Sequence, residues 1–139
     1  MKTELIEIYR CIKQNEPVVV VTVISSKGST PRTAGSKMVV YRGGEISGTI
    51  GGGAIEGDVI ERALPMFDTK TAQILFYDLR KDGRSSDLDL ICGGQMEVLL
   101  EFIDTDHENE DLYRSVYLKI KAEEPFFFKA DIRETGETI

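Results

Sequence analysis

Three glycine-bearing segments hold the residues best suited to chemistry: "GSTPR" at 28–32, "GGGAIE" at 51–56 and "CGG" at 92–94. The first offers two hydroxyls and the Arg32 guanidinium, whose paired N–H groups hold a phosphate or a carboxylate. The second precedes a helical pattern, where free N–H groups and the helix dipole favour an anion. The third places the Cys92 thiol beside bare backbone amides, an arrangement that favours a thiolate able to bind metal or carry sulfur.

Each segment also has a purely structural interpretation. Glycines at strand ends are usually turn residues, Arg32 can pair with one of the 24 acidic side chains, and a cysteine at a strand start is most often a small buried apolar residue. Glu56 suits the first turn of a helix but repels an anion bound there, so it either accepts N–H groups of a ligand or caps the helix. Three such segments in 139 residues favour a binding site over three unrelated turns.

A helix, a strand and a hairpin are predicted before the glycine triplet. The apolar spacing of residues 3–16 indicates a helix that ends at Pro17. The β-branched run at 18–24 indicates a strand that is covered on both faces. A polar loop at 25–36 comes next. The hairpin predicted at 37–50 turns at Gly43-Gly44, with three side chains pointing inward: Met38, Val40 and Ile46.

After the triplet, the pattern predicts a helix and two strands. Residues 54–64 are spaced as an amphipathic helix that stops near Pro65, and strands are expected at 72–78 and from Cys92 to Ile103. Strand ends in one sheet project to a shared rim, so the three glycine segments are expected to line one cleft. The fold class is therefore α+β, a mixed β-sheet flanked by helices.

An internal repeat is indicated by the last third of the chain. Residues 8–30 and 116–138 align without a gap, and four of the coinciding pairs are Tyr9/Tyr117, Ile12/Ile120, Lys13/Lys121 and Pro17/Pro125. The pattern is either a true helix-proline-strand-glycine repeat or the ordinary likeness of such junctions. The second copy reads "GETI" where the first reads "GSTPR", so a functional loop is expected in the first copy alone.

Composition sets the broad class. The length suits one domain, 1–139, and the two cysteines, in unlike surroundings, oppose a disulfide framework. A net charge of −7 without a basic cluster opposes a nucleic-acid partner. There is no apolar run near the ~18 residues of a membrane span and no leader-like N-terminus, so we expect a cytoplasmic chain without a membrane partner.

A dinucleotide-binding fingerprint is the rival motif. Gly51, Gly53 and Gly57 precede a helix, and Asp78 ends the next predicted strand. The match is weak, because the strand before it is short and the third glycine is displaced. A small NAD(P)-binding oxidoreductase is nevertheless kept as the alternative function, and a structural oligomerisation module as a third. His107, the single histidine, lies in an acidic stretch and gives little support to a catalytic pair or a zinc site.

Three longer segments together resemble the N-terminal domain of the XdhC/CoxI family, the accessory factors for xanthine dehydrogenase and carbon monoxide dehydrogenase. They are "VTVISSKGSTPRTAGSKMVV" (21–40), "GTIGGGAIEGDVIERA" (48–63) and "DLICGGQMEVLLEFI" (89–103). The resemblance covers roughly 5–103 as a core, and 110–139, which resembles 2–31, fits more loosely. Many members continue into a Rossmann domain, which is not expected here, so the chain is either a short form or a fragment.

The resemblance implies binding of the molybdenum cofactor, molybdopterin, by a chaperone that is not itself a turnover enzyme. Such a protein protects the cofactor, supports its sulfuration with a cysteine desulfurase and delivers it to a xanthine dehydrogenase-type molybdenum hydroxylase. A homodimer is expected. The residues implied as cofactor contacts are Ser29, Thr30, Pro31, Arg32, Gly51, Gly52, Gly53, Glu56, Cys92, Gly93 and Gly94. No residue is assigned a catalytic role with certainty, and Cys92 is the one candidate for contact with molybdenum or its sulfur.

Overall fold

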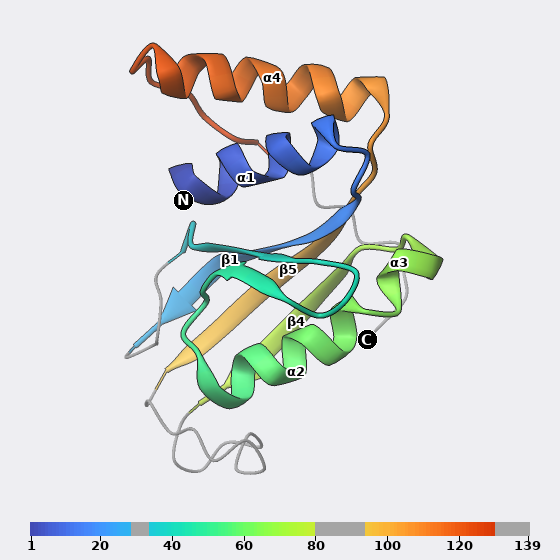
Figure 1. Cartoon of the computed structure of the whole chain (residues 1–139). Coiled ribbons are helices and arrows are strands. Elements are labelled where there is room, and N and C mark those ends of the chain that lie inside the picture. The colour runs from blue at the N-terminus through green and yellow to red at the C-terminus, as the bar shows by residue number, and fades with distance from the viewer. Residues whose placement is uncertain (29–33, 80–93, 130–139) are drawn as a thin grey trace.

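A computed structural model describes residues 1–28, 34–79 and 94–129 (Figure 1). The elements in chain order are α1 (Lys2–Lys13), β1 (Val18–Lys27), β2 (Lys37–Val40), β3 (Ile46–Gly48), α2 (Gly53–Ala63), α3 (Met66–Thr69), β4 (Gln73–Asp78), β5 (Gln95–Ile103) and α4 (His107–Lys121). The five strands form one sheet in the order β3-β2-β1-β5-β4. The predicted α+β class is confirmed.

Every strand pairing in the described sheet is antiparallel, where the sequence predicts a mixed sheet. The reason lies in the connections. Parallel neighbours need a crossover between adjacent strands, usually a helix. Here α2 and α3 connect β3 to β4, which lie at opposite edges of the sheet, so the crossover joins strands that do not pair.

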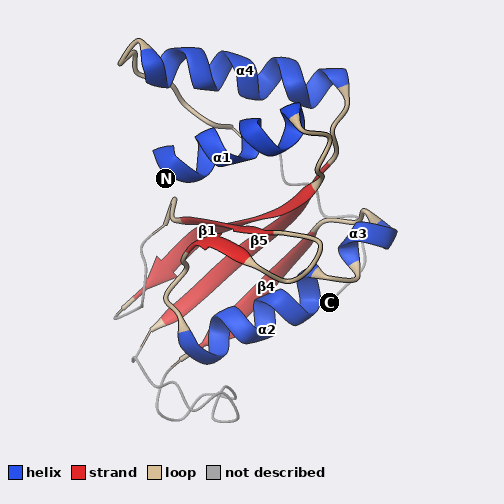
Figure 2. Ribbon diagram, in the orientation of Figure 1, coloured by secondary structure: helices blue, strands red, loops and turns tan. Residues whose placement is uncertain are grey.

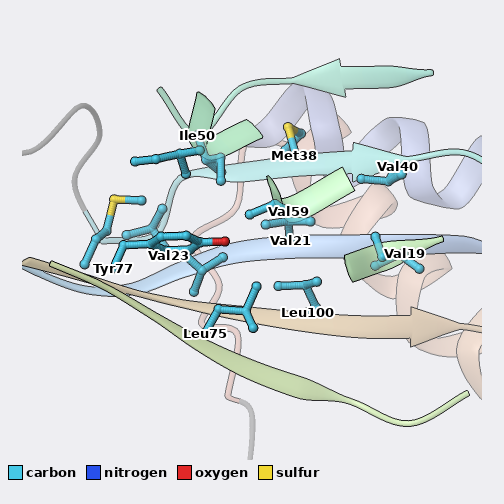
Figure 3. Close-up of a cluster of buried hydrophobic side chains, with 14 of the residues drawn as sticks. Val19, Val21, Val23, Met38, Val40, Ile50, Val59, Leu75, Tyr77 and Leu100 are labelled. Carbon is cyan, nitrogen blue, oxygen red and sulfur yellow. The ribbon is translucent and has the colours of Figure 1, made fainter. Parts of the chain in front are cut away.

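Helices cover both faces of the sheet (Figure 2). α1 and α4 lie over one face, and α2 and α3 lie over the other. The valines of β1 alternate between the two cores: Val19, Val21 and Val23 join the cluster beneath α2, shown in Figure 3, and Val18 and Val20 join the cluster beneath α1. All five are at most 1% exposed, which confirms the prediction of a strand covered on both faces.

β1 is three residues longer than predicted. After a register shift between Val23 and Ser25, its polar end continues to pair with β5, as far as Lys27 opposite Gln95. Residues 25–27 were predicted to be a loop because the apolar run ends before them. Backbone pairing needs no apolar side chain, so the strand continues. The loop therefore begins after β1.

The hairpin of β2 and β3 turns at Gly43-Gly44 as predicted, with the Tyr41 N–H donating to Glu45 O at 2.9 Å. Met38 and Val40 are fully buried, but Ile46, which pairs with Val40 in the register, is 39% exposed and is not part of the core. β3 is a three-residue edge strand, and no other strand in the described residues extends the sheet beyond it. Among the described helices, none is long and apolar enough to cross a membrane.

The helical halves of the predicted repeat pack against each other. The rings of Tyr9 on α1 and Tyr117 on α4, which occupy matched positions, lie 5.1 Å apart. Asp106 is the N-cap of α4, and its carboxylate accepts from the Asn109 N–H at 2.8 Å. Residues 125–129 follow α4 without forming a strand, and Phe126 packs against the cluster beneath α1. The repeat as a whole stays a prediction.

A cluster of hydrogen-bonded side chains, the Glu7 cluster, connects α1 to the hairpin of β2 and β3. The Glu7 carboxylate accepts from the Arg10 guanidinium at 2.6 and 2.9 Å and from the Tyr41 hydroxyl at 2.6 Å, and the Cys11 thiol lies 3.6 Å away. The hydrogen bond from Arg10 is the main cause that lowers the pKa of Glu7 to about 2, with smaller contributions from Tyr41 and Cys11. Burial, followed by the charge of Glu7, raises the pKa of the Cys11 thiol to about 11, so this cysteine is a packing residue.

The Glu7 cluster predicts that part of the free energy of unfolding is lost at acid pH. The pKa of Glu7 is lower in the folded state than the free value of 4.5, so its contribution to stability is fully present above that value and is lost as pH falls toward about 2. Glu7→Gln should lower the free energy of unfolding at pH 7 by about 1 kcal/mol and lower it less at pH 3. Urea denaturation at both pH values measures this. Glu61→Gln, at an exposed position on α2, should match wild type, and an undiminished acid sensitivity in Glu7→Gln would contradict the assignment.

Candidate functional site

One end of the sheet gathers the described flanks of all three glycine segments. Lys27 at the end of β1, Gln95 at the start of β5 and Asp78 at the end of β4 lie side by side in register. Just beyond them, the Leu79 N–H donates to Gly94 O at 2.8 Å. The first turn of α2 lies at this same end of the sheet (Figure 1). The arrangement of the described flanks is therefore the one expected if the three segments share a rim.

Of the predicted contact residues, five lie in described parts of the chain: Gly51, Gly52, Gly53, Glu56 and Gly94. Gly51 and Gly53 are exposed, whereas Glu56 and Gly94 are buried. The remaining six lie outside the described residues: Ser29, Thr30, Pro31, Arg32, Cys92 and Gly93. The detailed geometry of the site is therefore that of the glycine triplet and its surroundings.

The triplet needs glycine for its backbone conformation. The φ angles of Gly51, Gly52 and Gly53 are 132°, 76° and 61°, all in the region that residues with a β-carbon rarely adopt. Gly52 is the N-cap of α2, and no side chain caps this helix end. A β-carbon at Gly53 would find no atom within 4 Å, so the turn is open on that side.

Glu56 is linked to the glycine triplet by hydrogen bonds through Thr49, a residue that the sequence pattern did not single out. The Thr49 hydroxyl donates to the Glu56 carboxylate, 3.0 Å from Oε2 and 3.3 Å from Oε1, and its oxygen accepts from the Gly51 N–H at 3.0 Å. Glu56 is 8% exposed and is the one buried charged residue in the described part of the chain. It therefore does not cap the helix directly, but braces the turn through a hydroxyl.

This bracing changes what the triplet can bind. One of its N–H groups, that of Gly51, is already used inside the protein. The Oε2 atom of Glu56 lies 3.7 Å from the position that a β-carbon on Gly52 would occupy, so negative charge stands close to the turn. A helix N-terminus ordinarily favours an anion, but a carboxylate at this distance opposes one. The described geometry is poorer for phosphate than the sequence pattern indicates.

A second set of contacts holds α2 against the sheet. The Tyr77 hydroxyl of β4 donates to Asp58 Oδ2 at 2.6 Å, and Arg62 Nε donates to the same oxygen at 3.1 Å. Burial, followed by the hydrogen bond to Asp58, raises the pKa of Tyr77 well above its usual value. The apolar face of α2, formed by Ile55, Val59 and Ala63, is fully buried. The hydrogen bond from Tyr77 and the buried apolar face hold α2 against the sheet.

The dinucleotide-binding alternative does not fit the described sheet. Its fingerprint requires a strand, a helix and a second strand that pairs in parallel in the same sheet. β3 and β4, which flank α2, lie at opposite edges of an antiparallel sheet. Within the described ranges there is also no group of three His, Cys, Asp or Glu that could hold a metal ion.

The fold defines the class first: an α+β domain in which the described flanks of the three glycine-bearing segments lie at one end of an antiparallel sheet. Comparison with known families then gives the particular group. Residues 11–78 match the model of the XdhC and CoxI family. The resemblance seen in the sequence is confirmed.

The similar proteins agree with this assignment. The chain is 34% identical over 88 residues to an uncharacterised protein of Escherichia coli strain K12, YqeB, covering 63% of this chain and 16% of that protein. It is 31% identical over 93 residues to a probable xanthine dehydrogenase subunit of Bacillus subtilis strain 168, covering 66% of this chain and 28% of that protein. The chain therefore spans less than a third of either curated relative.

A solved structure shares the fold as well. It is a crystal structure of a xanthine dehydrogenase from Bacillus halodurans, with a TM-score of 0.67 and 28% sequence identity. The match covers 85% of this chain and 35% of that one.

Two alanine substitutions in α2 should have opposite effects. Gly53→Ala places a β-carbon at a φ of 61°, which should lower the free energy of unfolding by about 1–2 kcal/mol even though no atom blocks it. Gly57→Ala, in the exposed interior of the same helix with free space around it, should raise that free energy by about 0.5–1 kcal/mol. Thermal and urea denaturation compare the two. Equal effects would show that the turn at Gly53 is not the one described.

Proposed function

We propose that this chain is an accessory protein that binds the molybdenum cofactor on behalf of a xanthine dehydrogenase-type molybdenum hydroxylase. The observation that carries the proposal is the family match over residues 11–78, which includes both the "GSTPR" segment and the glycine triplet. One relative and the solved structure are both named as xanthine dehydrogenase proteins, which supports the choice of partner.

The chemistry of the described residues suits one end of such a cofactor. Molybdopterin combines a pterin ring, which has N–H donors, with a phosphate and with sulfur ligands that hold molybdenum. The buried Glu56 acceptor and the exposed, open side of Gly53 fit a flat ring with N–H donors. The proposal assigns the phosphate to Ser29, Thr30, Pro31 and Arg32, and the metal and its sulfur to Cys92, Gly93 and Gly94.

The proposed role is protection and transfer, and not turnover. The cofactor supplies the molybdenum centre that the hydroxylase uses, and this chain shields it, supports its sulfuration with a cysteine desulfurase and delivers it. We further propose that the protein acts as a homodimer. Size-exclusion chromatography with light scattering tests the oligomeric state independently of cofactor content.

The cofactor should copurify with the protein. When the chain is co-expressed with a molybdenum-cofactor supply, the purified wild type should carry pterin, assayed by fluorescence after oxidation, and molybdenum, assayed by mass spectrometry. Arg32→Ala should lower both by about tenfold, because a charge-assisted hydrogen bond is worth about 1.5–3 kcal/mol. Arg114→Ala, on the exposed side of α4 where Arg114 pairs with Glu110 and Asp111, is the matched control and should carry both at the wild-type level. A wild-type protein that carries neither pterin nor molybdenum would refute the proposal.

The Cys92 thiol should affect the metal more than the pterin. Cys92→Ala and Cys92→Ser should keep the pterin content of wild type but lose molybdenum or its sulfido ligand, and a partner hydroxylase activated with these variants should show severalfold less activity. If both variants activate the hydroxylase fully, the thiol has no part in the transfer.

A further inference from the structure

The Glu56 carboxylate is unusually short of partners for a buried charged group. Buried carboxylates are normally paired with cations or with several hydrogen-bond donors, because leaving water is costly for a charge. Glu56 is 8% exposed, and among the described residues its donor is a single Thr49 hydroxyl. One proton is shared between two oxygens that together offer about four acceptor positions. Most of the acceptor capacity of this side chain is therefore unused by the described protein.

The free acceptor positions of the Glu56 carboxylate lie beside the glycine turn, whose backbone carries no side chains. Oε2 is 3.7 Å from the position of a β-carbon on Gly52, and a β-carbon on Gly53 would meet nothing within 4 Å. Gly51 and Gly53 are exposed. The turn therefore leaves room for a group at Gly53, one residue from the position that lies beside Oε2.

The charge of Glu56 determines which chemical group of a ligand can bind beside the turn. A phosphate would bring a second negative charge next to a carboxylate in a poorly solvated position, and like charges a few ångströms apart repel strongly there. In contrast, two parallel N–H donors match the two oxygens of a carboxylate, as they do in a guanidinium–carboxylate pair. An aminopyrimidinone edge, with a ring N–H next to an exocyclic NH₂, offers this pair of donors.

We propose that Glu56 recognises the aminopyrimidinone edge of a pterin, so that the ring, and not the phosphate, lies against Gly51–Gly53. Thr49 positions the carboxylate and holds the turn closed through the Gly51 N–H. This inference rests on the proposed function for its choice of pterin and goes further by assigning one side chain to one end of the ligand.

A pair of ligands that differ at one group tests the inference. 6-Hydroxymethylpterin carries the donor edge and no phosphate, and 6-hydroxymethyllumazine replaces its NH₂ with a carbonyl oxygen. Fluorescence titration of the wild type should show binding of the pterin at least tenfold tighter than that of the lumazine. Glu56→Gln should erase or reverse this preference, because a glutamine amide donates to the lumazine carbonyl. Inorganic phosphate, measured by calorimetry, should bind Glu56→Gln at least as tightly as the wild type, because the Glu56 carboxylate opposes an anion at the turn.

The matched control is Glu61→Gln, at an exposed position on the same helix, which should keep the wild-type preference. A change of ligand preference cannot arise from a loss of stability alone, and circular dichroism verifies that each variant is folded. If Glu56→Gln does not fold, the wild type alone still decides, because equal affinity for the two ligands contradicts the inference.

The outcomes separate this inference from the proposed function. A wild type that copurifies with molybdopterin but whose ligand preference survives Glu56→Gln overturns the role of Glu56 and leaves the accessory function standing. A wild type that prefers the free pterin through Glu56 but copurifies with neither molybdopterin nor molybdenum supports the inference and overturns the accessory function. A wild type that binds neither free pterin nor cofactor overturns both.

Discussion

The antiparallel ladder between β1 and β5 is the interaction on which the rest of the structure depends. It runs from Val18 opposite Ile103 to Lys27 opposite Gln95, and it places the two strands at the centre of the sheet. One end of the ladder supports the two cores through the alternating valines of β1. The other end carries polar residues past the cores to the rim where the glycine segments begin and end. A single strand thus both stabilises the domain and positions the candidate site.

Much of this fold could be predicted because its signals are local. The β-branched run of β1 needs no partner to be recognised, and the Gly43-Gly44 turn has a conformational cause that the residue types reveal. The remainder depends on distant partners. Lys27 is in a strand because β5 lies beside it, and Ile46 is exposed because its strand lies at an edge, and neither fact is present in a short stretch of sequence.

The same division applies to the candidate site. The glycine triplet was predictable, because three consecutive glycines weaken any regular element unless the backbone needs them. The link between Thr49 and Glu56 was not, because these residues lie on either side of a turn whose positive φ angles bring them together. Without that link, the triplet resembles a generic phosphate loop, which is how the sequence alone presents it. The position of Glu56, which makes the triplet less favourable for phosphate, follows only from the folded turn.

A partly buried charge in the sheet, that of Lys37, shows what the Glu56 carboxylate on α2 lacks. On the α1 face, Lys37 Nζ donates to Thr22 Oγ1 at 2.8 Å, and Glu101 lies close enough to oppose the lowering of the Lys37 pKa that burial causes. Burial likewise raises the pKa of Glu101, and Lys37 opposes that shift. There the fold supplies a hydroxyl and an opposite charge together. Glu56 has the hydroxyl from Thr49 but no cation among the described residues, although a buried carboxylate requires compensation of the same kind. Lys37 compensates the charge of Glu101, whereas no described residue does the same for Glu56. A ligand with N–H donors, bound on the open side of the glycine turn, can compensate the charge of Glu56.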